Sequence, residues 1–117
     1  AHRAGVPILA STDASFANPY LFHGFSLLDE LDLYVAIGLT PREALHTATV
    51  APPRFFGLPD QDGTIAPGRR ADLVLLDANP LEGLATLRRP RMVIVGGRVL
   101  DRAALDGLEA GLLERGQ

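Results

Sequence analysis

The sequence predicts an α/β chain with a mainly helical first half and a mainly β second half. Helix start signals and apolar residues at helical spacing occupy residues 26–52. In the second half, short apolar runs are separated by turn pairs such as Gly96-Gly97. A third observation is the apolar run Gly5–Ala10, which ends abruptly in polar Ser11-Thr12-Asp13.

That first run has the composition of a strand buried on both faces. Gly5–Ala10 is short, apolar and partly β-branched, and Pro7 can lie near the start of a strand. Residues 14–25 contain Asn18-Pro19 and show no periodicity, so we expect a loop. A loop after a strand is a common location for functional residues.

Two helices are predicted to follow. Ser26 can cap the first with Asp29 three residues later, and Gly38 can close it. Thr40 opens the second, because Glu43 completes a capping box around it and a proline occupies the first helical position.

Turn signals divide the rest of the chain. Pro52-Pro53 should end the second helix, and Phe55-Phe56 should form an apolar turn that enters a core. Residues 71–76 read as a strand, and residues 92–100 read as a hairpin with a two-residue turn at Gly96-Gly97. Leucines at helical spacing predict a last helix over residues 103–115.

Composition excludes several function classes. The 117 residues are 47% hydrophobic and 21% charged, which suits one compact core. A net charge of −3 leaves no excess of positive charge, so we expect no nucleic-acid partner. The absence of cysteine excludes disulfides and thiolate metal sites. No run approaches the ~20 apolar residues of a membrane-spanning helix, so we expect no membrane partner.

The start of the sequence suggests a piece of a longer protein. It opens without methionine directly before an apolar run, and its one methionine is Met92. We therefore expect further chain upstream.

A series of different short motifs follows one another along the chain, and their order resembles that of a known family. They are Gly5–Ala14, Gly24-Phe25-Ser26-Leu27, Glu30-Leu31, Gly38–Leu45, Ala48-Thr49, Gly63–Gly68, Ala71–Asp77, Asn79-Pro80-Leu81 and the Gly96-Gly97 hairpin. Together they resemble the C-terminal portion of metal-dependent hydrolases of the amidohydrolase superfamily, in the imidazolonepropionase-like and related branches.

The resemblance implies a division of the chain into three parts. Residues 1–57 would be the last strand and the C-terminal helices of a TIM-type (β/α)8 barrel. Residues 58–102 would be the C-terminal part of a small β-sandwich, and residues 103–117 a C-terminal helix. The other barrel strands, with their histidine metal ligands, would lie upstream.

The resemblance also assigns a role to Asp13, as both metal ligand and catalytic residue. Without that context, an aspartate after threonine is most often a turn former or helix cap. Barrel enzymes place their chemistry at the C-terminal ends of strands, where this residue would stand. A carboxylate beside a divalent cation stays ionised and can take a proton from water. The implied cofactor is one or two divalent metal ions, most simply zinc.

His23 is a candidate substrate-binding residue in the loop after the first strand, although a surface histidine is the commoner case. His2 and His46 are interpreted as structural or solvent-facing. Asp72 is expected to bond turn backbone after Pro67-Gly68.

The clustered charges are interpreted as ordinary surface or helix-end charges and not as binding sites. Arg69-Arg70 and the arginines at 88, 89 and 91 are expected to be solvated loop charges. The acidic residues at 29, 30 and 32 are expected to be helix-start charges.

The resulting hypothesis is hydrolysis of an amide, cyclic amide or other non-peptide carbon–nitrogen bond in a small-molecule substrate. The alternatives are a non-catalytic homologue, a binding or assembly module, or a proline-dipeptidase-type hydrolase. A homo-oligomer is compatible with the sequence. A cytoplasmic location is favoured, and secretion would need a signal peptide upstream.

Overall fold

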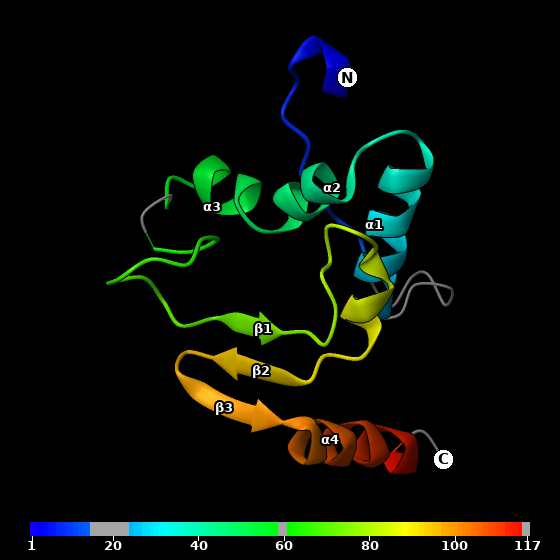
Figure 1. Cartoon of the computed structure of the whole chain (residues 1–117), viewed down its shortest axis with the longest axis vertical. Coiled ribbons are helices and arrows are strands. Elements are labelled where there is room, and N and C mark those ends of the chain that lie inside the picture. The colour runs from blue at the N-terminus through cyan, green and yellow to red at the C-terminus, as the bar shows by residue number, and fades with distance from the viewer. Residues whose placement is uncertain (15–23, 59–60, 116–117) are drawn as a thin grey trace.

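The computed structural model describes residues 1–14, 24–58 and 61–115, which form helices and a small sheet (Figure 1). The helices are α1 (Phe25–Ala36), α2 (Pro41–Ala48), α3 (Ala51–Phe55) and α4 (Arg102–Arg115), with 3-10 turns η1 (His2–Ala4) and η2 (Leu84–Arg88). The strands are β1 (Leu73–Leu75), β2 (Met92–Val95) and β3 (Arg98–Asp101). The described part is therefore α/β, as predicted. None of its helices is long and apolar enough to cross a bilayer.

Residues 5–10 form no strand, although the sequence predicted one there. A strand in a parallel sheet is held by hydrogen bonds to its neighbours, and the described residues place no other strand beside this segment. Residues 5–10 instead form hydrogen bonds with helices α1 and α2.

Helix α1 starts two residues earlier than the cap prediction required. Gly24, at φ +87°, is its N-cap and makes no side-chain cap bond, while Ser26 lies buried in the first turn. The prediction of Ser26 as the cap is therefore wrong, because glycine at positive φ lets the chain enter the helix before the serine. Gly38, at φ +112°, follows the helix end and its N–H donates to the Val35 carbonyl, as predicted.

Helix α2 begins with the predicted capping box. The Glu43 N–H donates to Thr40 Oγ1 at 3.3 Å, and the Thr40 N–H donates to Glu43 Oε2 at 2.7 Å. Pro41 occupies the first turn. This helix start is therefore set by local sequence.

The two prolines that follow α2 lie in the first turn of the next helix, α3 (Ala51–Phe55). Helix α2 ends at Ala48, and Pro52 and Pro53 lie in α3, where the first turn tolerates proline. Phe55 and Phe56 are 69% and 71% exposed and stack edge to face on each other, with ring centroids 5.2 Å apart. Their prediction as a core plug is wrong, because the described chain places no apolar surface over them.

The sheet is antiparallel with the order β1-β2-β3. Gly96 and Gly97 form the predicted two-residue turn, with φ values of +56° and +84° that suit a type I′ hairpin. The Gly96 N–H donates to Asp72 Oδ1 at 2.6 Å. Asp72 thus braces the hairpin turn, and the prediction that it bonds the turn after Gly68 is wrong.

The core is small and lies between the helices and η2. Leu31, Ala44 and Leu84 are its buried members. Helix α4 forms as predicted and continues directly from the end of β3 (Figure 1), and its Leu108 and Leu112 are exposed. Several apolar side chains of the sheet and of α4 are therefore left uncovered by the described residues.

Candidate active site

Asp13 stands out by its backbone conformation. Its φ of +49° makes it the one non-glycine residue with positive φ in the described part of the chain. Aspartate is among the few residues that tolerate this region, which costs most L-residues about 1–2 kcal/mol. The Ala14 N–H donates to Thr12 Oγ1 at 3.2 Å and closes a turn around Asp13. Backbone strain of this kind is concentrated at functional sites.

The carboxylate of Asp13 is presented outward. The residue is exposed, and none of the described side chains bonds its oxygens. An exposed carboxylate can ligate a cation or accept a proton.

Two helices hold the segment that leads to Asp13. The Ala10 N–H donates to the Thr47 carbonyl at the end of α2, at 3.0 Å. The Tyr34 hydroxyl of α1 donates to the Leu9 carbonyl at 3.4 Å. Ala10 also packs against the core cluster. The segment that precedes Asp13 thus contacts both α1 and α2.

Tyr34 is a neutral donor under ordinary conditions. Burial raises the pKa of its phenol to about 12, and a hydrogen bond and charge from Glu30 act in the same direction. Glu30 precedes Tyr34 by one helical turn, so the hydroxyl lies between the Glu30 carboxylate and the Leu9 carbonyl.

The acidic residues of α1 have a different role from the one predicted. Arg88 Nη2 lies 2.8 Å from Asp29 Oδ1 and 2.6 Å from Asp32 Oδ2. These bonds raise the pKa of Arg88 and tie η2 to α1. The two aspartates are not helix-start charges, and Arg88 is not a solvated loop charge.

Neither His2 nor His46 bonds Asp13 in the described part of the chain. His2 Nε2 lies 2.9 Å from Glu43 Oε1, and both side chains are about two-fifths exposed. Hydrogen bonds from Thr40 backbone and from His2 lower the pKa of Glu43 to about 2. His46 is exposed on α2. His2 thus has a side-chain partner and His46 faces solvent, and their interpretation as residues outside the site stays a prediction.

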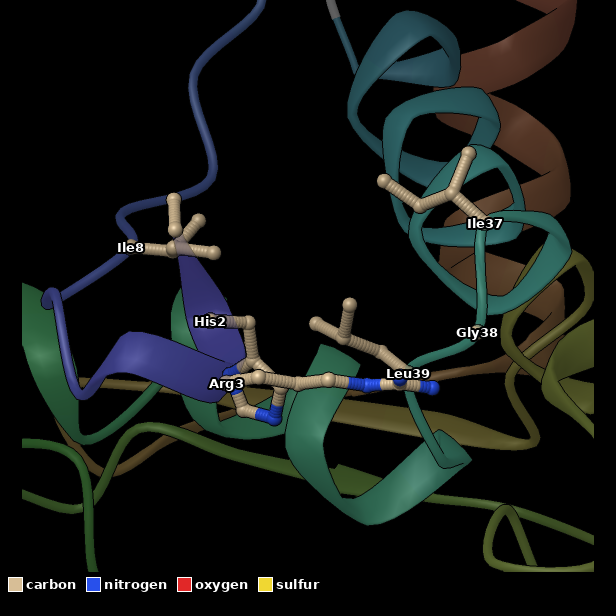
Figure 2. A pocket seen from close by; sticks show the side chains of 7 residues that line it. His2, Arg3, Ile8, Ile37, Gly38 and Leu39 are labelled. Atoms are coloured by element: carbon tan, nitrogen blue, oxygen red, sulfur yellow. The ribbon is translucent and has the colours of Figure 1, made fainter.

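Two open hollows lie beside the start of the chain. The first, of about 310 Å³, is lined by residues 1–3, Ile8 and residues 37–39, and Figure 2 shows Ile8 and Ile37 on opposite sides of it. The second, of about 390 Å³, is lined chiefly by residues 5–8 and by the α2 side chains around Glu43 and His46. Asp13 lines neither hollow.

No group of three or more His, Asp or Glu side chains that could hold a metal occurs among residues 1–14, 24–58 and 61–115. Among these described residues, Asp13 has no further metal-ligating side chains grouped with it. His23, the predicted substrate contact, lies outside the described residues.

The sequence interpretation missed several contacts between segments that are far apart in the chain. Tyr34, Thr47 and Arg88 act through backbone bonds or ion pairs between segments far apart in the chain. Asp29 and Asp32 are three apart and share a helix face, which indicates a pair of carboxylates but does not identify Arg88 as their partner.

Comparisons with known proteins connect this arrangement to enzymes. Residues 1–100 match the model of the Amidohydrolase family. An adenine deaminase of Methylobacterium nodulans is 44% identical over 73 residues, which cover 62% of this chain and 12% of that protein. An imidazolonepropionase of Polaromonas sp. is 37% identical over 110 residues, covering 91% of this chain and 24% of that protein.

A solved structure has a similar fold. The crystal structure of a Xaa-Pro dipeptidase with bound methionine in the active site superposes with a TM-score of 0.75 at 28% identity. The match covers 86% of this chain and 23% of that one. This chain thus spans about a quarter or less of the length of each of these proteins.

Proposed function

Because this chain belongs to the amidohydrolase family, we propose that it is part of an enzyme that hydrolyses a carbon–nitrogen bond. The observation that carries the proposal is the family match across residues 1–100, which includes Asp13 in its outward, positive-φ presentation. The relatives named adenine deaminase and imidazolonepropionase support a bond outside ordinary peptides.

In this proposal the chain completes a larger fold. Residues 1–57 are the last strand and C-terminal helices of a (β/α)8 barrel, in which residues 5–10 gain the parallel neighbours that they lack here. Residues 58–102 belong to a β-sandwich, and residues 103–117 form the final helix. The exposed apolar faces of β1–β3 support a covering layer in the complete protein.

The chemistry of Asp13 fits one ligand of a divalent metal, for which we propose zinc. An exposed carboxylate without a described partner can ligate a cation, but catalytic zinc needs about three protein ligands, so the others belong to the rest of the protein. When bound, such a metal lowers the pKa of water and polarises a carbonyl or amidine carbon.

In this proposal Asp13 is the proton-transferring residue. As a carboxylate it accepts a proton from the attacking water and releases it to the departing nitrogen, which leaves as a neutral amine. The exposure of Asp13 supports this role, since a proton-transferring carboxylate must be accessible to the reacting groups. His23 is proposed to contact the substrate.

A second candidate is hydrolysis of short Xaa-Pro substrates. It is favoured by the dipeptidase structure, which superposes on 86% of this chain. The two candidates share the carbon–nitrogen chemistry and differ in the acyl and amine groups that the pocket accepts.

The test uses the full-length protein and a substrate panel. N-acyl amino acids, cyclic amides, adenine and Xaa-Pro dipeptides are assayed before chelation, after chelation and after zinc is restored. We expect one class to be hydrolysed, with activity lost on chelation and regained with metal. Turnover that survives complete metal removal, or a metal-loaded protein that cleaves no class, would overturn the proposal in favour of a non-catalytic or binding role.

A further inference from the structure

The helical part of the chain, residues 24–58, and its sheet part, residues 61–101, meet at two separate places. One place is η2, which lies in the connection between β1 and β2 and contacts α1 (Figure 1). The other is the turn around Gly63, which approaches the corner between α2 and α3. The two contacts therefore involve different helices.

At η2 an apolar side chain and a cation act together. Leu84 is 7% exposed and packs into the buried cluster between the helices. Arg88, at the other end of η2, reaches the carboxylates of Asp29 and Asp32 at 2.8 and 2.6 Å. These ion pairs are partly exposed, so each stabilises only weakly, and burial of the leucine supplies most of the stabilisation. The guanidinium, bonded to two carboxylates, fixes the orientation of η2 on α1.

At Gly63 the contact is made by backbone alone. A Cβ at this position would overlap the Thr49 carbonyl oxygen and lie 3.2 Å from the Cα of Val50. The turn is closed at its base, because the Arg70 N–H donates to the Gln61 carbonyl at 3.0 Å. Only glycine lets this closed turn come so close to the corner between the helices.

The two parts occur together in a longer enzyme. The superposition on the Xaa-Pro dipeptidase structure covers 86% of this chain with a TM-score of 0.75. Neither part makes up that share of the chain, so the superposition includes both in a similar relative placement. Neither contact involves residues 5–10, which gain new neighbours in the proposed barrel. We therefore expect both contacts to be kept in the full-length protein.

We propose that η2 and the Gly63 turn form a two-point clamp, which fixes the sheet part on the helical part so that the two unfold as one unit. A single contact would let the sheet pivot about it. Contacts with α1 and with the corner between α2 and α3 fix its orientation, so both are required. The inference uses the proposed division into barrel and sandwich and needs no assumption about the reaction.

Scanning calorimetry of two matched pairs of variants of the full-length protein tests the clamp. Gly63→Ala and Gly68→Ala both place alanine at positive φ, +85° and +82°, but a Cβ at Gly68 would meet nothing within 4 Å. Leu84→Ala removes a buried side chain, whereas Leu81→Ala truncates a leucine of the same connection that is 42% exposed.

We expect one endotherm for the wild type and for the controls Gly68→Ala and Leu81→Ala. Gly63→Ala and Leu84→Ala should each give two endotherms, with the first at least about 4 °C below the Tm of the matched control. Two endotherms in the wild type, or a single endotherm for either Gly63→Ala or Leu84→Ala, would overturn the clamp.

Native-state hydrogen exchange of the wild type tests the same point without a substitution, in case a clamp variant does not fold. As denaturant is raised, the slowest amides of α2 and of β2 should converge on one free energy of opening. Separate opening free energies that never converge would overturn the clamp. Neither measurement uses a substrate, so the proposed hydrolysis and the role of Asp13 stand or fall independently.

Discussion

Single polar side chains define most of the local geometry of this chain by bonding backbone groups. Glu43 and Thr40 bond each other's N–H groups at the start of α2, and Asp72 accepts from Gly96 at the hairpin turn. Tyr34 does the same for the segment before Asp13. Each bond satisfies a backbone group that would otherwise lack a protein partner.

Glu43 gives one pH-dependent prediction. Its pKa falls from 4.5 to about 2 on folding, so the ionised cap stabilises the fold fully above about pH 4.5. That contribution is lost as the pH falls through about 2. Glu43→Gln should therefore lower the free energy of unfolding at pH 6, and its deficit relative to wild type should shrink between pH 4.5 and 2.

Denaturant unfolding across this pH range checks the prediction. Glu82→Gln, at an exposed carboxylate, is the charge-matched control and should show no such dependence. A deficit for Glu43→Gln that stays constant from pH 6 to 2 would contradict the assignment.

Asp72 gives a second prediction at this scale. Asp72→Ala leaves the Gly96 N–H without its 2.6 Å partner and should lower the free energy of unfolding by about 1–2 kcal/mol. Asp77→Ala removes an exposed carboxylate 3.6 Å from Arg91 and should cost less than about 0.5 kcal/mol. Equal losses in urea unfolding would show that the bond to Gly96 is not stabilising.

Sequence reasoning succeeded for residues with local partners and failed for those with distant ones. The capping box spans three residues, so its pattern is visible in the sequence. Asp72 and Gly96 are 24 positions apart, and Arg88 and Asp29 are 59 apart, so only the folded chain reveals those bonds. The positive φ of Asp13 also has no reliable sequence signal, because aspartate adopts several conformations in turns.

At the scale of elements, the hairpin is the best-defined unit. Two apolar strands joined by Gly-Gly predict its turn and register, and the structure pairs Val95 with Arg98 across that turn. Residues 5–10 show the opposite case. A buried strand depends on partners outside itself, so its composition alone did not produce a strand in this chain.

The hairpin turn gives a prediction that separates its two glycines. A Cβ at either position would meet nothing within 4 Å, so any cost is conformational. Gly97→Ala, at φ +84°, should destabilise the protein by about 1 kcal/mol, since alanine avoids positive φ. Gly96→Asn, at φ +56°, should be nearly neutral because asparagine is favoured there in type I′ turns. Thermal unfolding that ranks the two variants in the reverse order would contradict the turn assignment.

At the scale of the whole molecule, the helical and sheet parts are joined by a narrow set of contacts. Leu84 of η2 packs into the helical core, and Arg88 bonds α1 close by. Elsewhere the sheet is open: Val74 and Val95 are 55% and 56% exposed on one face, and Val99 is 55% exposed on the other. The overall α/β class and the order of elements follow from sequence patterns, whereas the size of the core does not.

The isolated 117-residue chain should therefore self-associate. Its apolar sheet faces, the free edge of β1 and the exposed Phe55-Phe56 pair offer surface for other copies. Analytical ultracentrifugation over a concentration series should show oligomers or aggregates. A monodisperse monomer at high concentration would indicate that these surfaces need no cover.

The most direct test of the central claim is the turnover of Asp13→Asn in the full-length, metal-loaded protein. Asn keeps the size of the side chain and tolerates positive φ, but it cannot act as a base. We expect kcat to fall by about 10²-fold or more, while the matched variant Asp77→Asn keeps wild-type kcat. Near-normal turnover of Asp13→Asn on the substrate that the protein hydrolyses would contradict the assignment of Asp13 as the proton-transferring residue.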